Sequence, residues 1–349
     1  MPLLPLYGHE AVRSRLAGAI ASGRLPQSLL LEGPQGVGKQ RLGFWIAQAL
    51  LCEQEKGHGM PCGACRPCHL VAGLGHPDVH WFVPVEPSKK AGDADKQVEL
   101  VEEAIAEEVG RRRAEPLYGP PSGLASHGIA SVRLLLRRIA LTPAMAGMKV
   151  FIIGDAERLI PQVGSEQAAN ALLKALEEPP HDTQFVLTAQ DPEALLPTIL
   201  SRVVRVRMQR LPDSVVTEFA QKELGGGSKG SLRAQNVAGA DGCPGRLIAK
   251  RGGGAAGGVG VAAPWEKRAE PVARYALALA QRPFEARGGF SDMLDQLLER
   301  FRGELRAGGD TGKLMAAIAQ VLDARDMAQG NVNPQLLTAV LAEDLSRRS

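Results

Sequence analysis

Hydrophobic and polar positions along residues 1–208 alternate between short apolar runs and longer stretches with apolar residues at helical spacing. The short runs predict strands at residues 28–32, 76–87, 149–155, 183–190 and 203–208. The helical spacing predicts helices at residues 9–21, 41–51, 131–141 and 165–180, the last capped by Ser165, and a helical turn at 193–202. Repeated strand–helix alternation is typical of an α/β core with a parallel sheet.

After residue 208 only the helical pattern continues. Residues 209–251 predict a small helical domain, and residues 265–349 predict a separate all-α domain. Between them, residues 252–264 read GGGAAGGVGVAAP, which has the composition of a flexible linker. Within the first domain, residues 87–127 are polar and charge-rich, so we expect an inserted surface segment that is partly helical and partly mobile.

Composition is that of an ordinary globular protein, with 44% hydrophobic and 23% charged residues in 349. A net charge of +3 argues against binding nucleic acid mainly through one strongly basic body, and 4% aromatic residues argues against base-stacking platforms. The sequence contains no apolar run long enough to span a membrane, and its N-terminus lacks the features of a secretory signal. We therefore expect a cytoplasmic protein without membrane contact.

The stretch GPQGVGKQ, residues 33–40, stands between a predicted strand and a predicted helix, which is the context that a phosphate-binding loop requires. Backbone N–H groups of such a loop converge on phosphate oxygens, and a lysine at position 39 would reach the β and γ phosphates. A later strand supplies Asp155 at its end, where an aspartate completes a Mg²⁺ shell. The alternative is a chance glycine turn. The residues predicted to bind ATP or ADP with Mg²⁺ are Gly33, Gly36, Val37, Gly38, Lys39, Gln40 and Asp155.

Two departures from an active ATPase are visible. Gln40 replaces the Ser or Thr whose hydroxyl holds the metal, and it offers only a carbonyl oxygen on a longer arm. In oligomeric ATPases of this type a Glu directly follows the strand-end Asp, whereas here the order is Asp155-Ala156-Glu157, which redirects the carboxylate. Losing the metal ligand and the water-polarising group costs rate more than affinity, so we expect nucleotide binding without efficient turnover.

Four of the five cysteines, Cys52, Cys62, Cys65 and Cys68, fall within 17 residues. Four thiolates on a short loop rich in Gly and Pro suit tetrahedral zinc, and the metal would supply the folding energy of a loop with little core. Free thiols and an iron–sulfur cluster are the alternatives. His58 and His69 are expected at the surface rather than among the ligands.

Other charged residues have plainer interpretations. Glu177 and Glu178 are expected to end a helix rather than act as an acid–base pair. Arg111, Arg112 and Arg113 are expected to form a solvated run that balances acidic residues of the same insert. Cys243 is expected to be a small buried apolar residue, and Arg202, taken alone, a surface ion-pair partner.

Motifs along most of the chain carry a resemblance to a known family. They are GPQGVGK followed by the four cysteines, then HPD, FIIGDAERL, AANALLKALEEPP, LLPTILSR and NVNPQLL. With them the chain resembles the bacterial clamp-loader family of the DNA polymerase III holoenzyme, and the delta-prime type more than the ATPase motor type. The insert at 87–127 and the glycine linker lie outside the resemblance.

The resemblance implies an ATPase module of the AAA+ type, a small helical lid, and a helical collar that joins subunits in a ring of five. It implies a rigid stator that assists motor and delta-type subunits in loading a sliding clamp onto primed DNA. Arg202 matches an arginine finger directed at a neighbouring subunit's ATP, although the family's Ser-Arg-Cys is Ser-Arg-Val here. Thr188 matches the first sensor and Arg246 the lid sensor. The rival functions are an active ATPase motor and a scaffold that binds no nucleotide.

Overall fold

The structure is a computed structural model. It describes residues 3–54, 59–86, 93–115, 118–119, 121, 125–145, 147–160, 166–224, 237, 240–251, 293–294, 297–298, 300–302, 304–305, 308–329 and 333–348. The chain divides into two compact units, the first of Met1–Pro121 with Ala125–Gly252 and the second of Gly253–Ser349 with Ser122–Leu124. Each unit is considered by itself.

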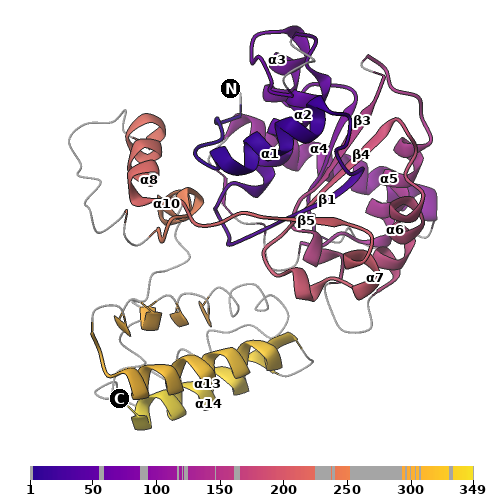
Figure 1. The fold of residues 1–349 in the computed structure, drawn as a ribbon. Coiled ribbons are helices and arrows are strands. Elements are labelled where there is room, and N and C mark those ends of the chain that lie inside the picture. Colours follow the sequence, from indigo (N-terminus) through magenta and orange to yellow (C-terminus); the bar gives the residue numbers. More distant parts are fainter. Residues whose placement is uncertain are drawn as a thin grey trace. The chain divides into compact units, whose positions relative to one another are not determined.

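A five-stranded parallel sheet forms the centre of the first unit, in the order β2-β3-β4-β1-β5 (Figure 1). The strands are β1 (Ser28–Glu32), β2 (Val79–Phe82), β3 (Lys149–Ile153), β4 (Thr183–Ala189) and β5 (Val204–Arg207). The central strands β1, β3 and β4 are buried almost throughout, which explains their continuous apolar runs.

Helices cover both faces of the sheet, as is usual for an all-parallel sheet (Figure 1). The helix α2 (Lys39–Leu51) packs across β1, β3 and β4, and α1 (Glu10–Ala21) packs on α2. On the opposite face lie α5 (Ile129–Ile139), α6 (Gln167–Glu177) and α7 (Pro197–Leu200) (Figure 1). Short 3-10 helices at Ala156–Leu159 and Pro192–Ala194 follow β3 and β4. The predicted α/β class with a parallel sheet is confirmed.

The predicted insert contains a long helix, α4 (Ala94–Ala114), which packs against α5. Its buried residues are Val98, Ile105 and Arg112. The described residues 125–127 belong to the core rather than to a surface segment: Ser126 pairs with Val85, and His127 is 2% exposed. The insert therefore packs against the first unit along α4 as well as at its C-terminal end.

Residues 208–251 continue the first unit with α8 (Asp213–Phe219), a π-helical turn at Ala220–Leu224, and α10 (Pro244–Arg251). They form a small core of their own around Val216, Phe219 and Leu247. The N-terminal residues join this core, since Tyr7 stacks edge-on against Phe219 at 5.3 Å. A helical lid beginning near residue 209 fits this arrangement but stays a prediction.

The described part of the second unit is helical and contains α13 (Thr311–Gln329) and α14 (Pro334–Arg348), which pack together. Leu294, Leu297, Val321 and Leu341 lie in its core. The predicted linker 252–264 and the Ser165 cap lie outside the described residues. No helix in the described part of the chain has the length and apolarity needed to cross a membrane.

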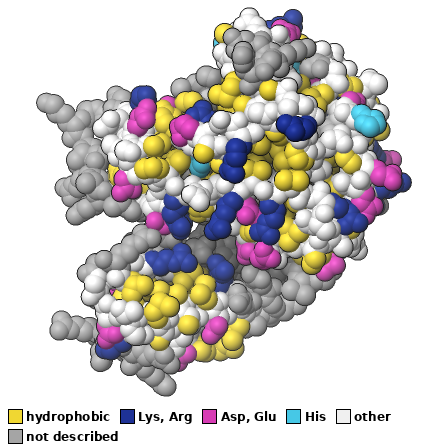
Figure 2. Space-filling view, viewed as in Figure 1, with side chains coloured by type: hydrophobic (Ala, Val, Ile, Leu, Met, Phe, Trp, Pro, Cys, Tyr) yellow, Lys and Arg dark blue, Asp and Glu magenta, His cyan; other side chains and the backbone are white. Residues whose placement is uncertain are grey.

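On the face drawn in Figure 2, basic side chains stand in several places with acidic side chains beside them. This distribution agrees with a net charge of +3.

Candidate functional site

The phosphate loop connects β1 to α2 at the carboxyl end of the sheet, where ligands of open α/β folds bind. Gly36 and Gly38 have φ angles of 78° and 107°, in the region that favours glycine. A Cβ on Gly36 would lie 3.0 Å from the backbone nitrogen of Arg246, and the Gly245 N–H donates to the Gly36 carbonyl at 2.9 Å. The start of α10 therefore lies against the loop and brings Arg246 beside it, while the role of Arg246 as a lid sensor stays a prediction.

Lys39 is 7% exposed, and its ammonium donates to the carbonyl oxygens of Gly33 and Pro34 at 2.8 and 3.0 Å. Burial lowers the pKa of Lys39, against the opposing effect of the Glu157 and Asp155 carboxylates. The lysine head is thus held within the loop by its own backbone. Lys39 also stands at the N-terminus of α2, where the helix dipole favours an anion.

Gln40 bridges the loop and the end of β3. Its Nε2 donates to Asp155 Oδ2 at 3.2 Å, and its Oε1 accepts from the Tyr118 hydroxyl at 3.1 Å, with Arg112 Nη1 at 3.5 Å. The orientation of the amide follows from chemistry, because an ionised carboxylate only accepts and a guanidinium only donates. In this arrangement Gln40 turns its amide N–H, and not the expected carbonyl oxygen, toward Asp155.

These residues do not fit Mg²⁺ at its expected position. Mg²⁺ takes oxygen ligands in octahedral geometry. Here the side chain that follows Lys39 turns an N–H toward Asp155, and that hydrogen bond occupies one oxygen of the aspartate. The donor set at this point is an amide nitrogen and a carboxylate bound to each other, so the predicted Mg²⁺ has one fewer ligand than in an active ATPase.

Asp155 adopts a positive φ of 52°, and its backbone N–H donates to the Thr188 hydroxyl at 3.0 Å. Thr188 is fully buried in β4, so it positions Asp155 from the predicted sensor position. Glu157 Oε1 accepts from the Gln190 N–H at 3.0 Å, while its buried Oε2 has no hydrogen-bond partner among the described residues. Burial raises the pKa of Glu157 to about 7, and the Asp155 charge acts in the same direction.

The interpretation of Arg112 as part of a solvated run is wrong. Its side chain is fully buried, with its guanidinium 4.9 Å from the Trp81 ring and 4.5 Å from the Tyr118 ring. Arg112 Nε donates to Glu108 at 2.6 Å. Arg111 and Arg113 are exposed, as predicted. Sequence reasoning missed Arg112 and Tyr118 as neighbours of the phosphate loop.

A further loop contact comes from the N-terminal segment. The ring of His9, 9% exposed, lies with Nε2 3.0 Å from the Val37 carbonyl oxygen. Burial lowers the pKa of His9, so the neutral ring is favoured. No motif in the sequence indicated this residue.

Arg202 follows α7 and is paired within its own chain. Its Nη2 lies 2.5 Å from Glu177 Oε1 at the end of α6, and its Nη1 donates to the Thr198 carbonyl at 2.8 Å. About a third of the Arg202 side chain is exposed. The pair matches the plainer interpretation of both residues, and a finger role would require the guanidinium to leave Glu177.

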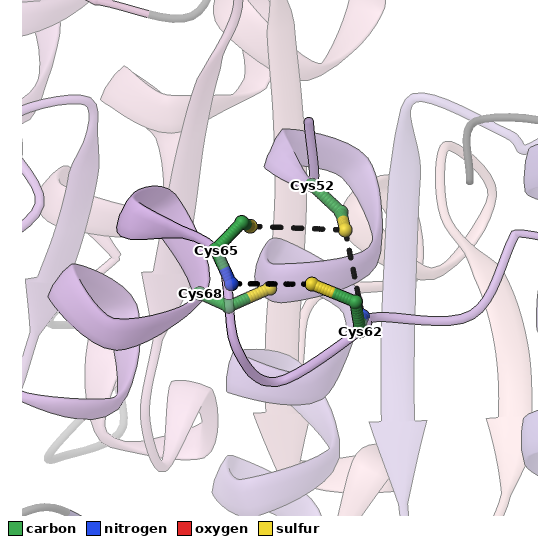
Figure 3. Close-up of side chains that lie close together, drawn as sticks. All are labelled: Cys52, Cys62, Cys65 and Cys68. Atoms are coloured by element: carbon green, nitrogen blue, oxygen red, sulfur yellow. Dashed lines mark hydrogen bonds between the residues drawn. The ribbon is translucent and has the colours of Figure 1, made fainter. Parts of the chain in front are cut away.

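The four cysteines come together as predicted, with their sulfur atoms within 4.8 Å of one another (Figure 3). Cys52 ends α2 and Cys65 precedes α3 (Arg66–Ala72), so two helix ends hold the group. Backbone N–H groups point at the sulfurs: Cys62 N–H donates to Cys52 Sγ at 3.4 Å, and Cys65 N–H to Cys62 Sγ at 3.3 Å.

The cysteine group suits a tetrahedral metal ion. Zn–S bonds of about 2.3 Å place the sulfurs of a tetrahedron about 3.8 Å apart, and Cys52 and Cys65 Sγ are 3.9 Å apart. Burial raises the pKa of Cys65, but hydrogen bonds to its sulfur outweigh burial and lower it to about 6. His69 is exposed and outside the group, and His58 lies outside the described residues. Cys243 is fully buried, as predicted.

Comparison with known proteins gives a family match over the first unit. A family model described as DNA polymerase III, delta subunit, matches residues 8–212. The chain is 28% identical to the DNA polymerase III subunit delta' of Escherichia coli K12 over 210 residues, which are 60% of this chain and 50% of that protein. It is 34% identical to subunit delta' of Pseudomonas aeruginosa over 197 residues, 56% of this chain and 46% of that protein.

A motor-type relative matches the same part of the chain. Identity to the DNA polymerase III subunit tau of Escherichia coli K12 is 29% over 206 residues, 59% of this chain and 25% of that protein. The matched part of this chain spans about half the length of the delta' proteins. Sequence similarity therefore identifies the family but does not distinguish a delta-prime subunit from a motor subunit. That distinction depends on the residues of the site.

Proposed function

We propose that this chain, which belongs to the DNA polymerase III delta subunit family, is a stator subunit of the delta-prime type in a bacterial clamp loader. Its relatives are delta' and tau subunits, so a clamp-loader role is common to both types. In the proposed role the chain helps motor and delta-type subunits to place a sliding clamp on primed DNA.

The observation that carries the stator assignment is the hydrogen bond between Gln40 Nε2 and Asp155 Oδ2 at 3.2 Å. In an active site of this type the hydroxyl after the lysine and the strand-end aspartate hold the metal ion that neutralises charge during phosphoryl transfer. Here those two positions satisfy each other. Glu157 is held by the Gln190 N–H rather than standing directly after Asp155. The loop, with Lys39 inside it, retains the features that bind a nucleotide, whereas the features that support hydrolysis are replaced.

In this role the chain contributes the Arg202 guanidinium to ATP hydrolysis on a neighbouring subunit. Arg202 stands at the end of α7 with about a third of its side chain exposed and an exposed partner, Glu177. Exposed ion pairs of this kind contribute only about 0–1 kcal/mol. The guanidinium is therefore released at small cost to reach a phosphate on an adjoining subunit, where such a residue accelerates hydrolysis.

The cysteine group has a structural role in this proposal. It joins the end of α2 to the start of α3 through a loop that contains Gly59, where a Cβ would meet the Ala17 carbonyl oxygen at 2.0 Å. A zinc ion on the four thiolates would hold this loop against α1. No acid–base residue stands in the group, so we assign the metal to stability rather than catalysis.

Phosphate release tests the assignment. The purified chain is expected to bind a fluorescent ATP analogue, to lose that binding in Lys39→Ala, and to release phosphate no faster than Lys39→Ala does. Within the assembled loader, Arg202→Ala is expected to lower the ATPase rate by about 10³-fold or more, the usual contribution of an arginine finger. An assembled complex that is unaffected by Arg202→Ala would remove the finger role.

A motor-type ATPase is the second candidate, favoured by the tau match. The two candidates differ in one result: a motor subunit releases phosphate when magnesium is present, in a manner that Lys39→Ala abolishes. Absence of analogue binding by the parent chain would instead favour the scaffold that binds no nucleotide.

A further inference from the structure

We propose that the insert closes the magnesium position of this site, because Arg112 of α4 and Tyr118 hold the Gln40 amide against Asp155, so that nucleotide binds without a metal ion. The inference rests on the nucleotide binding proposed above and adds its metal dependence. It also gives the insert a function that the family resemblance does not cover.

The first step is the position of the Gln40 amide. Gln40 directly follows Lys39 at the start of α2, and Asp155 follows β3, so the two residues occupy the metal-holding positions of a phosphate-loop site. Their side chains are bonded to each other at 3.2 Å. An N–H group pointing at the carboxylate offsets part of its charge, as a cation would, and it occupies one of the two aspartate oxygens.

The second step is what fixes the amide. Asp155 alone would leave the Gln40 side chain free to turn, but its Oε1 is held from the other side by the Tyr118 hydroxyl at 3.1 Å. Arg112 Nη1 lies 3.5 Å from the same oxygen, a long contact that excludes the reversed amide because both groups would then be donors. Each end of the amide therefore has a partner of the correct kind.

The third step is the rigidity of Arg112. The side chain is fully buried, pairs with Glu108 at 2.6 Å, and lies over the rings of Trp81 and Tyr118. A guanidinium enclosed by aromatic faces and one carboxylate is held on several sides. Its Nη2 has no hydrogen-bond partner in the described part of the chain. A buried charge with an unsatisfied donor costs free energy. We attribute the presence of Arg112 at this position to its contact with the Gln40 amide.

Space around the amide points the same way. A Cβ on Gly154 would lie 2.8 Å from Gln40 Nε2 and 3.2 Å from its Cδ. The backbone of the strand end thus passes close to the amide, and only glycine leaves room for it. The Lys39 ammonium already acts on both the Asp155 and the Glu157 carboxylates, so part of the negative charge that would attract a divalent cation is offset.

The test is a titration of the full-length chain with a fluorescent ATP analogue, with magnesium and with EDTA. The parent chain is expected to give the same Kd in both conditions, within about twofold. Gln40→Ser frees Asp155 and supplies a hydroxyl, and its Kd is expected to be at least about tenfold lower with magnesium than with EDTA, a difference of about 1.4 kcal/mol. A parent chain whose affinity falls tenfold on chelation would overturn the proposal.

Two neighbouring arginines provide the matched control. Arg111 and Arg112 both pair with Glu108, but only Arg112 reaches Gln40. Arg112→Met is expected to acquire magnesium dependence and Arg111→Met to behave like the parent. Tyr118→Phe, which keeps the ring and removes only the hydroxyl, replaces Arg112→Met if that variant fails to fold. Equal behaviour of Tyr118→Phe, Arg111→Met and the parent would contradict the role of the insert.

Failure of nucleotide binding itself is distinguishable from failure of this inference. If the parent chain binds no analogue in either condition, the nucleotide part of the proposed function fails, and thermal unfolding decides the remainder. Gln40→Ala and Tyr118→Phe are then expected to lower Tm non-additively, because each removes the same hydrogen bond. Additive changes would show that the two side chains are independent and would overturn the inference.

Discussion

Gly154→Ala offers a quantitative test of where the Gln40 amide lies. Gly154 has no positive φ, so alanine can adopt the same backbone conformation. Its added Cβ would, however, lie 2.8 Å from Gln40 Nε2, while the next neighbour beyond Gln40 is the Phe82 carbonyl oxygen at 3.5 Å, an ordinary contact. The methyl group therefore conflicts with Gln40 and with no other side chain nearby.

The magnitude follows from that geometry. Moving the amide removes a hydrogen bond to a charged group, worth about 1.5–3 kcal/mol. Replacing glycine by alanine also restricts the unfolded chain, which stabilises by about 0.4–1 kcal/mol. The net expectation is a loss of about 0.5–2.6 kcal/mol, or about 1–10 °C in Tm for a unit of this size. With Gln40→Ala already present, the conflict is absent and only the stabilising effect remains, so Gly154→Ala should then raise Tm.

Thermal unfolding of the parent, the two single variants and the double variant measures this reversal of sign. Gly110→Ala is the control, because Gly110 lies within α4 with nothing within 4 Å of its added Cβ. It is expected to stabilise by about 1 kcal/mol in either background. If Gly154→Ala has the same effect with and without Gln40, the amide does not lie against the end of β3.

Three further predictions concern other parts of the first unit. Elemental analysis is expected to give one zinc per chain, and chelation to lower Tm because metal binding supplies folding energy; iron with sulfide, or no metal, would contradict the site. Glu177→Gln frees Arg202 from its 2.5 Å pair and is expected to raise the ATPase rate of an assembled loader by up to about fivefold, the limit set by an exposed ion pair; a lower rate would mean that the pair positions Arg202. Burial of His127 lowers its pKa from 6.5 to about 4, so between these pH values the unfolded chain binds a proton that the folded chain does not. The free energy of unfolding is therefore expected to fall as the pH falls from 6.5 toward 4, and to fall less steeply in His127→Gln.

The strands were the most predictable part of this fold. β1, β3 and β4 lie within a few residues of their predicted bounds because both faces of the sheet are covered and the apolar runs are continuous. The strand predicted at 76–87 is shorter, Val79–Phe82. The preceding residues form a turn in which Asp78 accepts the backbone N–H groups of Ala144 and Met145, a contact between distant segments that local periodicity does not contain.

The candidate site also has parts that local sequence patterns predict and parts that depend on packing. The phosphate loop, the strand-end aspartate and the cysteine group are local patterns, and the structure brings their members together. Arg112 was missed because a run of arginines is usually solvated. One signal was present, since Val98, Ile105 and Arg112 are spaced by seven residues on one buried stripe of α4. The contact of that stripe with Gln40, 72 residues away, depends on packing.

The central claim is that this chain keeps the phosphate cradle of its family while its own side chains replace the groups that drive hydrolysis. Single-turnover phosphate release from ATP by the purified, isolated chain in excess magnesium tests it most directly. We expect ATP to be bound and recovered intact, with no more phosphate released than by Lys39→Ala. Rapid magnesium-dependent release that Lys39→Ala abolishes would contradict the account.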